Sequence, residues 1–160
     1  MAKSAPNSSG PQITYIFELE LKSDLDVCKD FILESGQYTH GCDEPGTIKF
    51  EWYLSPDQKC ATLLEIFESS DAAKLRVENL IASSLAPRFQ TLFEIKSFLV
   101  LGEVDAELRD MLSDFGAEFR KYGGGFYRVW VISVGLIDRP IRRYNTSIGC
   151  QCHSCSLYHR

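Results

Sequence analysis

Residues 47–67 read TIKFEWYLSPDQKCATLLEIF, and this stretch decides the fold class. In its first part, Thr47–Leu54, apolar and polar side chains alternate with the period of two that is typical of a β-strand. The sequence Ser-Pro-Asp-Gln at 55–58 is typical of a turn. We interpret Cys60–Phe67 as the strand that follows this turn. The stretch therefore predicts a β-hairpin in the first half of the chain.

Further strands and helices are expected on both sides of the hairpin. Strands are indicated by alternation, and helices by apolar residues at helical spacing. The expected strands cover 13–21, 90–101 and 117–122, and the expected helices cover 24–38, 71–87 and 104–115. The first six elements then have the order of the split βαβ repeat. This order predicts an α+β, ferredoxin-like antiparallel sheet with helices on one face.

The predicted domain covers residues 12–122, and segments of different composition flank it. Residues 1–11 are polar and contain no apolar run, so they lack the core of a secretion signal, and we expect a disordered lead there. Residues 123–160 begin with three glycines and carry net positive charge. We expect this part to be a Gly-linked extension that need not be ordered throughout.

Charge and hydropathy exclude some classes of partner. The chain has a formal net charge of -5, and acidic residues dominate residues 1–122. A nucleic-acid groove needs clustered Lys and Arg, so the acidic domain argues against one. No stretch approaches the ~18 consecutive apolar residues that a membrane span needs. We therefore expect a soluble, cytoplasmic protein that binds neither nucleic acid nor membrane.

The six cysteines fall into two groups. Without a secretion signal, those of the domain are interpreted as reduced thiols: Cys28, Cys42 and Cys60. Cys150, Cys152 and Cys155, together with His159, are soft ligands that suggest zinc, but their spacing is irregular for a structural zinc site. We assign no metal and no cofactor, and the role of this tail stays open.

The two faces of the predicted sheet differ in chemistry. The face expected under the helices carries Tyr15, Phe17, Leu19, Ile48, Phe50, Trp52, Thr62, Leu64, Ile66, Phe93, Ile95 and Leu99. The other face mixes aromatic, aliphatic and charged residues, namely Glu18, Glu20, Lys49, Glu51, Tyr53, Leu63, Glu65, Phe67, Glu94, Lys96, Phe98 and Val100. Large exposed apolar patches usually mark interfaces. We therefore expect a homodimer through Glu18, Lys49, Glu65, Phe67 and Lys96; the alternative is an exposed amphipathic sheet in a monomer.

Two motifs resemble those of a known superfamily. The segment EPGTIKF at 44–50 resembles the signature E-P-G-x-x-x-F/Y, and LEIFESSDAAKLR at 64–76 resembles E-x-F/W-x-S/D-x-x-A-x-x-x-H. Both signatures belong to the antibiotic biosynthesis monooxygenase-like, or dimeric α+β barrel, superfamily. The resemblance covers residues 13–122 and implies a homodimeric barrel of two facing sheets. The superfamily includes cofactor-independent quinol and anthrone oxygenases, haem-degrading enzymes and many members of unknown activity.

Arg76 stands where the superfamily often has histidine. An imidazole can transfer a proton near neutral pH, whereas a guanidinium stays protonated. Arg76 could therefore hold a phenolate or a carboxylate but could not act as a base. The alternative is a surface arginine on the second predicted helix.

The resemblance implies a pocket within each subunit, between the sheet and the helices. Trp52 is expected on the helix side, and Tyr38 and His40 at the end of the first helix. With Arg76 they supply an aromatic wall, a phenol, an imidazole and a cation, which suit a small, flat, electron-rich aromatic ligand. The plainer interpretations are core packing for Trp52 and a loop position for His40. Glu51 and Glu65 could serve as carboxylate acid and base, although we favour dimer salt bridges for them.

Two functions are consistent with these residues. The first is a cofactor-independent monooxygenase-like protein acting on a quinol or another small activated aromatic, with Arg76 and His40 as catalytic residues and Tyr38 and Trp52 as substrate-binding residues. The second is a non-catalytic homodimeric ligand-binding or stress-associated module of the same fold. A haem-degrading protein is a distant third, because His40 is the sole histidine of the domain.

Overall fold

The computed structural model of the chain describes residues 12–125. The expected N-terminal lead and nearly all of the expected Gly-linked extension lie outside these residues. Cys150, Cys152, Cys155 and His159 lie outside them as well. The fold and the candidate site are therefore those of the predicted α+β domain.

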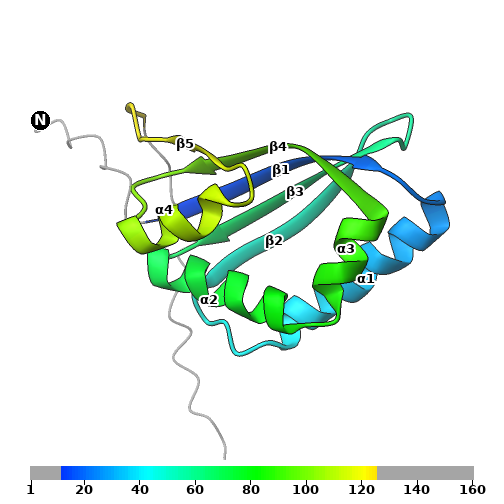
Figure 1. Cartoon of the computed structure of the whole chain (residues 1–160), viewed down its shortest axis with the longest axis horizontal. Coiled ribbons are helices and arrows are strands. Elements are labelled where there is room, and N and C mark those ends of the chain that lie inside the picture. The colour runs from blue at the N-terminus through cyan, green and yellow to red at the C-terminus, as the bar shows by residue number, and fades with distance from the viewer. Residues whose placement is uncertain (1–11, 126–160) are drawn as a thin grey trace, which may run out of the picture. The chain divides into compact units, whose positions relative to one another are not determined.

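Nine elements make up this domain (Figure 1). They are β1 Ile13–Leu21, α1 Leu25–Gly41, β2 Thr47–Leu54, β3 Cys60–Phe67, α2 Ser70–Ala82, α3 Leu85–Leu92, β4 Phe93–Leu101, α4 Ala106–Ser113 and β5 Glu118–Arg120. The strands form one sheet in the order β2-β3-β1-β4-β5, in which only the β4–β5 pair is parallel. The helices lie on one side of the sheet (Figure 1). This is the predicted α+β, ferredoxin-like fold.

The segment between β3 and β4 holds two helices rather than the single one predicted over 71–87. Helix α2 ends at Ala82, Ser83 is extended, and α3 runs over Leu85–Leu92. Pro87 is the third residue of α3, where a missing backbone N–H removes no helical hydrogen bond. Pro87 therefore belongs to the first turn of a new helix and does not mark the end of the earlier one. Strand β4 accordingly begins at Phe93 instead of residue 90.

The predicted orientation of β3 is wrong. Leu63 pairs with Phe17, and Glu65 pairs with Tyr15, so the two β3 residues share the helix side with the core residues of β1. All of the odd-numbered residues of β3 are buried, including Phe67. Glu65 and Phe67 therefore cannot contribute to an interface on the outer face. Two of the outward residues of β3, Leu64 and Ile66, are also large and aliphatic, which made the alternation ambiguous.

A β-bulge in β4 exchanges the two faces of the sheet for the side chains in the second half of this strand. Leu19 pairs with Ile95 while its neighbour Glu18 pairs with Ser97, so Lys96 is an extra residue in the ladder. A bulge of this kind shifts every later side chain to the opposite face. Phe98 is therefore buried under the helices, contrary to the prediction, and Leu99 faces outward.

The core has two parts that meet at the middle of β1. One cluster, associated with α2 and α4, contains Ile13, Tyr15, Phe67, Ala73, Val77, Phe98, Val100, Leu108 and Leu112. The other cluster, associated with α1 and α3, contains Leu19, Cys28, Phe31, Ala61, Leu63, Leu85, Leu92 and Phe93. The side chain of Phe17 packs against both clusters. The space between the clusters is where the candidate site lies.

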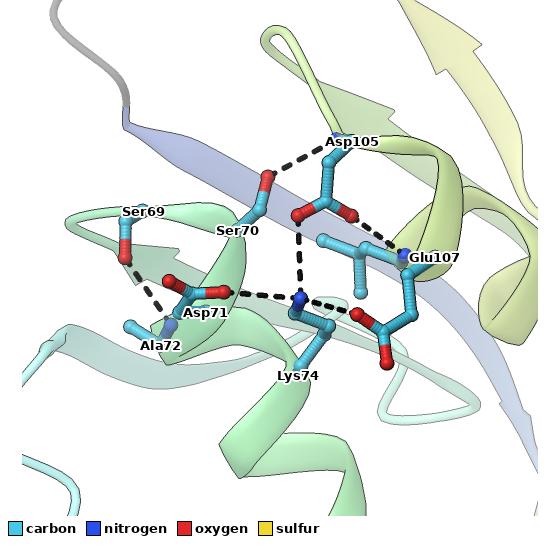
Figure 2. A network of polar contacts seen from close by, with 8 residues as sticks. Ser69, Ser70, Asp71, Ala72, Lys74, Asp105 and Glu107 are labelled. Atoms are coloured by element: carbon cyan, nitrogen blue, oxygen red, sulfur yellow. Dashed lines mark hydrogen bonds and ion pairs between the residues drawn. The ribbon is translucent and has the colours of Figure 1, made fainter.

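Polar contacts fasten the start of α2 to the start of α4 (Figure 2). The ammonium group of Lys74 lies 3.0 Å from Asp71, 3.3 Å from Asp105 and 2.8 Å from Glu107. The Asp105 carboxylate also accepts a hydrogen bond from the backbone N–H of Leu108, which caps α4. These contacts hold the starts of the two helices together.

The N-cap of α2 allows a first stability test. The hydroxyl of Ser69 accepts a hydrogen bond from the backbone N–H of Ala72 at 3.2 Å (Figure 2). We expect Ser69→Ala to lower the free energy of unfolding by about 1 kcal/mol, because a helix N–H loses its acceptor. Ser69→Thr keeps the acceptor and should remain close to the wild type. Urea unfolding of the two variants measures this difference, and equal losses would contradict the capping role.

Candidate functional site

A cavity of about 360 Å³ lies between the sheet and the helices. Strands β1 to β4 and all four helices contribute side chains to its wall. Its volume lies within the range of small-molecule sites. The cavity therefore occupies the place that the superfamily resemblance implies for a pocket.

Aromatic rings form much of the cavity wall. Trp52 lies edge-on to Phe31 at 6.4 Å between ring centroids, and its centroid lies 6.4 Å from that of Phe89. Phe17 and Phe98 also line the cavity, and their rings are stacked with 4.0 Å between centroids. Aromatic walls of this kind suit a flat apolar ligand, since ring faces and edges both make favourable contacts.

The mouth of the cavity is marked by lining residues that reach solvent. Ile81 in α2, Ile95 in β4 and Phe115 just after α4 are 57%, 39% and 43% exposed. Gln90 of α3 also lines the cavity and is exposed, so the exposed lining is mostly apolar with one polar side chain.

A buried ion pair lies in the wall. Arg76 of α2 is 4% exposed, and its Nε donates a hydrogen bond to Oε1 of Glu65 at 2.9 Å. Its guanidinium group lies over the ring of Phe50, 5.1 Å from the centroid. Arg76 and Glu65 both line the cavity. They are the only charged residues in the part of the wall that the structure describes.

A second carboxylate lies behind this pair. Glu44 is buried, and its Oε1 lies 3.8 Å from Nη1 of Arg76. The Glu44 carboxylate also accepts hydrogen bonds from Asn79 at 2.9 Å and from Thr47 at 3.1 Å. Glu44 does not line the cavity. Its role is to anchor the guanidinium from behind.

Burial raises the pKa of Glu65 above its ordinary value. The nearby Arg76 acts in the opposite direction by attraction and by its hydrogen bond, and Glu44 reinforces the rise. The effect of burial is the larger, because Glu65 lies fully inside the domain and shares Arg76 with Glu44. Glu65 is therefore a carboxyl group in a cavity that can change its protonation state closer to neutral pH than an exposed glutamate can.

Three buried donors on the wall have no hydrogen-bond acceptor among residues 12–125. They are the hydroxyl of Tyr15, the indole Nε1 of Trp52 and Nη1 of Arg76. Burial, and then the charge of Glu65, strongly raise the pKa of Tyr15, so its hydroxyl stays protonated. Buried donors are normally paired. All three belong to residues that line the cavity, and each lacks a hydrogen-bond partner within the described residues.

The cavity contains only part of the predicted site. Trp52 and Arg76 line it, whereas Tyr38 and His40 do not. His40 is exposed in the last turn of α1, because this helix extends to Gly41 and so includes residues predicted as a loop. Tyr38 is 38% exposed. Desolvation, followed by the neighbouring thiol of Cys42, raises the pKa of Tyr38.

The two carboxylates considered as an acid and base pair lie on opposite faces of the sheet. Glu51 is on the outer face, where it pairs with Lys49 at 3.2 Å and accepts a hydrogen bond from Tyr53. Glu65 was expected beside Glu51 and instead faces the cavity. The signal that could have found it is a second apolar pattern in β3, in which Glu65 falls between Leu63 and Phe67.

Residues 12–125 contain no cluster of three or more His, Cys, Asp or Glu side chains placed to hold a metal ion. Within the same range, no helix has both the length and the apolar character needed to cross a membrane. Cys28, Cys42 and Cys60 are free thiols, and Cys28 is buried in the core. None of the three lines the cavity.

Among solved structures, the chain is similar to MupZ from Pseudomonas fluorescens, with a TM-score of 0.63 and 15% identity over 74% of this chain and 96% of that protein. It also matches SnoaB, a cofactor-independent oxygenase from Streptomyces nogalater, with a TM-score of 0.47 and 9% identity over 57% of this chain and 91% of that one. No family model and no curated protein sequence matches the chain. The identity to MupZ shows a shared fold alone. That shared fold agrees with the ferredoxin-like sheet, with helices on one face, that the sequence predicts.

Proposed function

We propose that this chain is a cofactor-independent monooxygenase-like protein that acts on a quinol or another small activated aromatic. The observation that carries the proposal is the cavity, which combines aromatic walls with buried hydrogen-bond donors and one ion pair. A flat aromatic molecule with one or two oxygen substituents matches both features. Aromatic faces bind the ring, and the donors bind the oxygens.

The residues of the wall have distinct roles in this proposal. Trp52 and Phe31 bind the ring of the substrate on one side of the cavity. Tyr15 and Nη1 of Arg76 donate hydrogen bonds to a substrate oxygen, and these bonds strengthen as that oxygen gains negative charge. Arg76 therefore stabilises the phenolate. His40 lies outside the cavity and has no place in this scheme.

The substrate itself supplies the electrons. A quinol that has lost a proton transfers electrons to dioxygen. One oxygen atom then forms a bond to carbon, and the other leaves as water, so that quinol and O₂ give a hydroxyquinone and H₂O. The apolar wall excludes bulk water from the reacting oxygen. No metal or flavin is needed to balance this reaction.

The alternative is a non-catalytic ligand-binding or stress-associated module. Arg76 occupies the position where the superfamily often has a histidine, and a guanidinium does not transfer protons. The same cavity would then bind an aromatic molecule without converting it. The two proposals share the ligand class and differ only in turnover.

Pairing of two copies through the outer face of the sheet belongs to both proposals. Leu64, Ile16 and Leu99 stand opposite one another across β3, β1 and β4, and Ile66 extends this apolar stripe. All four side chains are partly exposed in the single chain. A second copy of the sheet would cover them and form a homodimeric barrel. Glu18 and Lys49 lie on the same face and remain candidates for ion pairs between the copies.

The cavity assignment predicts a specific loss of ligand binding. We expect Trp52→Leu to raise the Kd of an oxidised naphthoquinone about tenfold, because a stacking surface worth roughly 1.4 kcal/mol is removed. The matched control is Tyr53→Leu, which changes the neighbouring residue on the outer face and should leave the Kd unchanged. Isothermal titration calorimetry measures both values.

Turnover separates the two proposals. A panel of benzo- and naphthohydroquinones is incubated with the wild type, with and without oxygen, and dioxygen uptake is compared with the spontaneous rate. Oxygen-dependent consumption that weakens in Trp52→Leu supports the monooxygenase. Saturable binding without consumption supports the binding module, and the absence of binding contradicts both.

A further inference from the structure

The buried charges at the cavity do not balance. Two carboxylates, Glu65 and Glu44, share one cation, Arg76, inside the domain. The group therefore carries one net negative charge in a place where charges are weakly screened. A carboxylate ligand would be repelled there. A neutral hydroxyl group that can give up a proton would not be repelled.

One oxygen of Glu65 is free to take that proton. Among residues 12–125, the hydrogen bond to Glu65 reaches Oε1 only, and it comes from Nε of Arg76. Oε2 accepts no hydrogen bond from these residues, and Glu65 lines the cavity. The carboxylate is thus held in position through one oxygen, and its other oxygen has no hydrogen bond among the described residues. This is the arrangement that a general base requires.

We propose that Glu65 is the general base of the cavity and that it removes the hydroxyl proton from a phenolic ligand. The ligand O–H bond breaks and a new O–H bond forms on Oε2 of Glu65. The electron pair stays on the ligand oxygen, which becomes a phenolate held by Arg76 and Tyr15. Nothing is oxidised in this step. The inference rests on the proposed function, because it assumes an aromatic hydroxyl compound in the cavity.

The surroundings of Glu65 favour this role over the alternatives. The charged and titratable groups that face it are Arg76 from α2, Glu44 from the segment before β2, and Tyr15 from β1. Burial and Glu44 raise the pKa of Glu65. A carboxylate whose pKa is raised is a stronger proton acceptor than an exposed one. The net charge does not change when the proton moves from ligand to Glu65, so the buried group is not further destabilised.

The test uses a probe that reports its own protonation. Bound 4-nitrophenol is measured by absorbance at a pH where the free probe is mostly un-ionised, because its phenolate absorbs at longer wavelength. We expect the phenolate band in the wild type and its loss in Glu65→Gln, with the probe still bound. Glu51→Gln is the matched control, because it removes a carboxylate on the outer face of the sheet, away from the cavity lining, and should retain the band. With quinols, kcat/KM of Glu65→Gln should fall about 10²–10⁴-fold.

Each outcome decides the proposal. If the wild type binds the probe but shows no phenolate band, Glu65 is not the base. The same conclusion follows if Glu65→Gln shows the same band as the wild type. In both cases the cavity remains a binding site for aromatic molecules. A band that depends on Glu65, without oxygen uptake from quinols, supports the base and overturns the monooxygenase. Failure of the wild type to bind the probe overturns both. If Glu65→Gln does not fold, Glu65→Asp replaces it; this variant withdraws the carboxylate by one methylene, and an undiminished band would then contradict the proposal.

Discussion

Replacing Arg76 by methionine is expected to lower the free energy of unfolding by about 3–5 kcal/mol at neutral pH. The substitution keeps an apolar stem over Phe50 but removes the cation that Glu65 and Glu44 share. Both carboxylates are then buried without an opposite charge. An uncompensated buried charge is far more costly than the ion pair itself. The expected loss is a large part of the roughly 5–15 kcal/mol that stabilises a domain.

The deficit of Arg76→Met should depend on pH in a defined direction. Burial raises the pKa of Glu65 in the folded protein above the ordinary value of 4.5. The folded state therefore binds more protons than the unfolded state as the pH rises above 4.5, and the free energy of unfolding falls with rising pH. Loss of Arg76 removes the two effects that lower this pKa. The free energy of unfolding of the variant should thus be closest to that of the wild type at acidic pH and furthest below it at basic pH.

Urea unfolding at several pH values measures this prediction. The double variant Arg76→Met with Glu65→Gln is the control, because it removes both charges of the closest pair. It should recover much of the loss, and the recovery measures the coupling between the two residues. A deficit that does not change with pH, or a double variant as unstable as Arg76→Met, would show that packing and not charge explains the effect.

The positions of the strands could be predicted from the sequence far better than their faces. Alternation in β1 and β2 and the turn between β2 and β3 are local features, so the bounds of these strands agree with the structure. Strand β3 lies inside the sheet and carries large apolar residues on both faces, so alternation alone does not orient it. The bulge at Lys96 is a property of pairing with β1, and no local pattern predicts it.

These two errors explain what was missed at the candidate site. Trp52 could be placed on the helix side from the pattern of β2, and Arg76 was singled out by the motif at 64–76. Glu65 was placed on the outer face because β3 was inverted. The pairing with Arg76 that makes the burial of Glu65 possible joins β3 to α2, and no local pattern in β3 indicates it. Tyr15 was correctly expected under the helices. That its hydroxyl has no hydrogen-bond partner among the described residues follows only from the three-dimensional contacts around it.

Truncation of Phe67 gives the other large effect, a loss of about 3–5 kcal/mol in the free energy of unfolding for Phe67→Ala. The ring is fully buried and packs against Tyr15 at 4.8 Å between centroids. It does not line the cavity, so the new void lies in the core behind the site. Had Phe67 faced the partner, as the alternation of β3 suggested, the loss would instead appear mainly as weaker self-association.

Ile66→Ala is the matched control for Phe67→Ala, because Ile66 is the next residue along β3 and points to the outer face. It is only partly buried in the single chain, so its truncation should lower the free energy of unfolding much less. If two copies pair through this face, Ile66→Ala should raise the dissociation constant of the dimer measured by analytical ultracentrifugation. Phe67→Ala, examined under conditions where it remains folded, should leave that constant nearly unchanged. The opposite pattern would support the orientation of β3 predicted from alternation, in which Glu65 faces away from the cavity. This pair of variants therefore also tests the premise on which the proposal of Glu65 as general base rests.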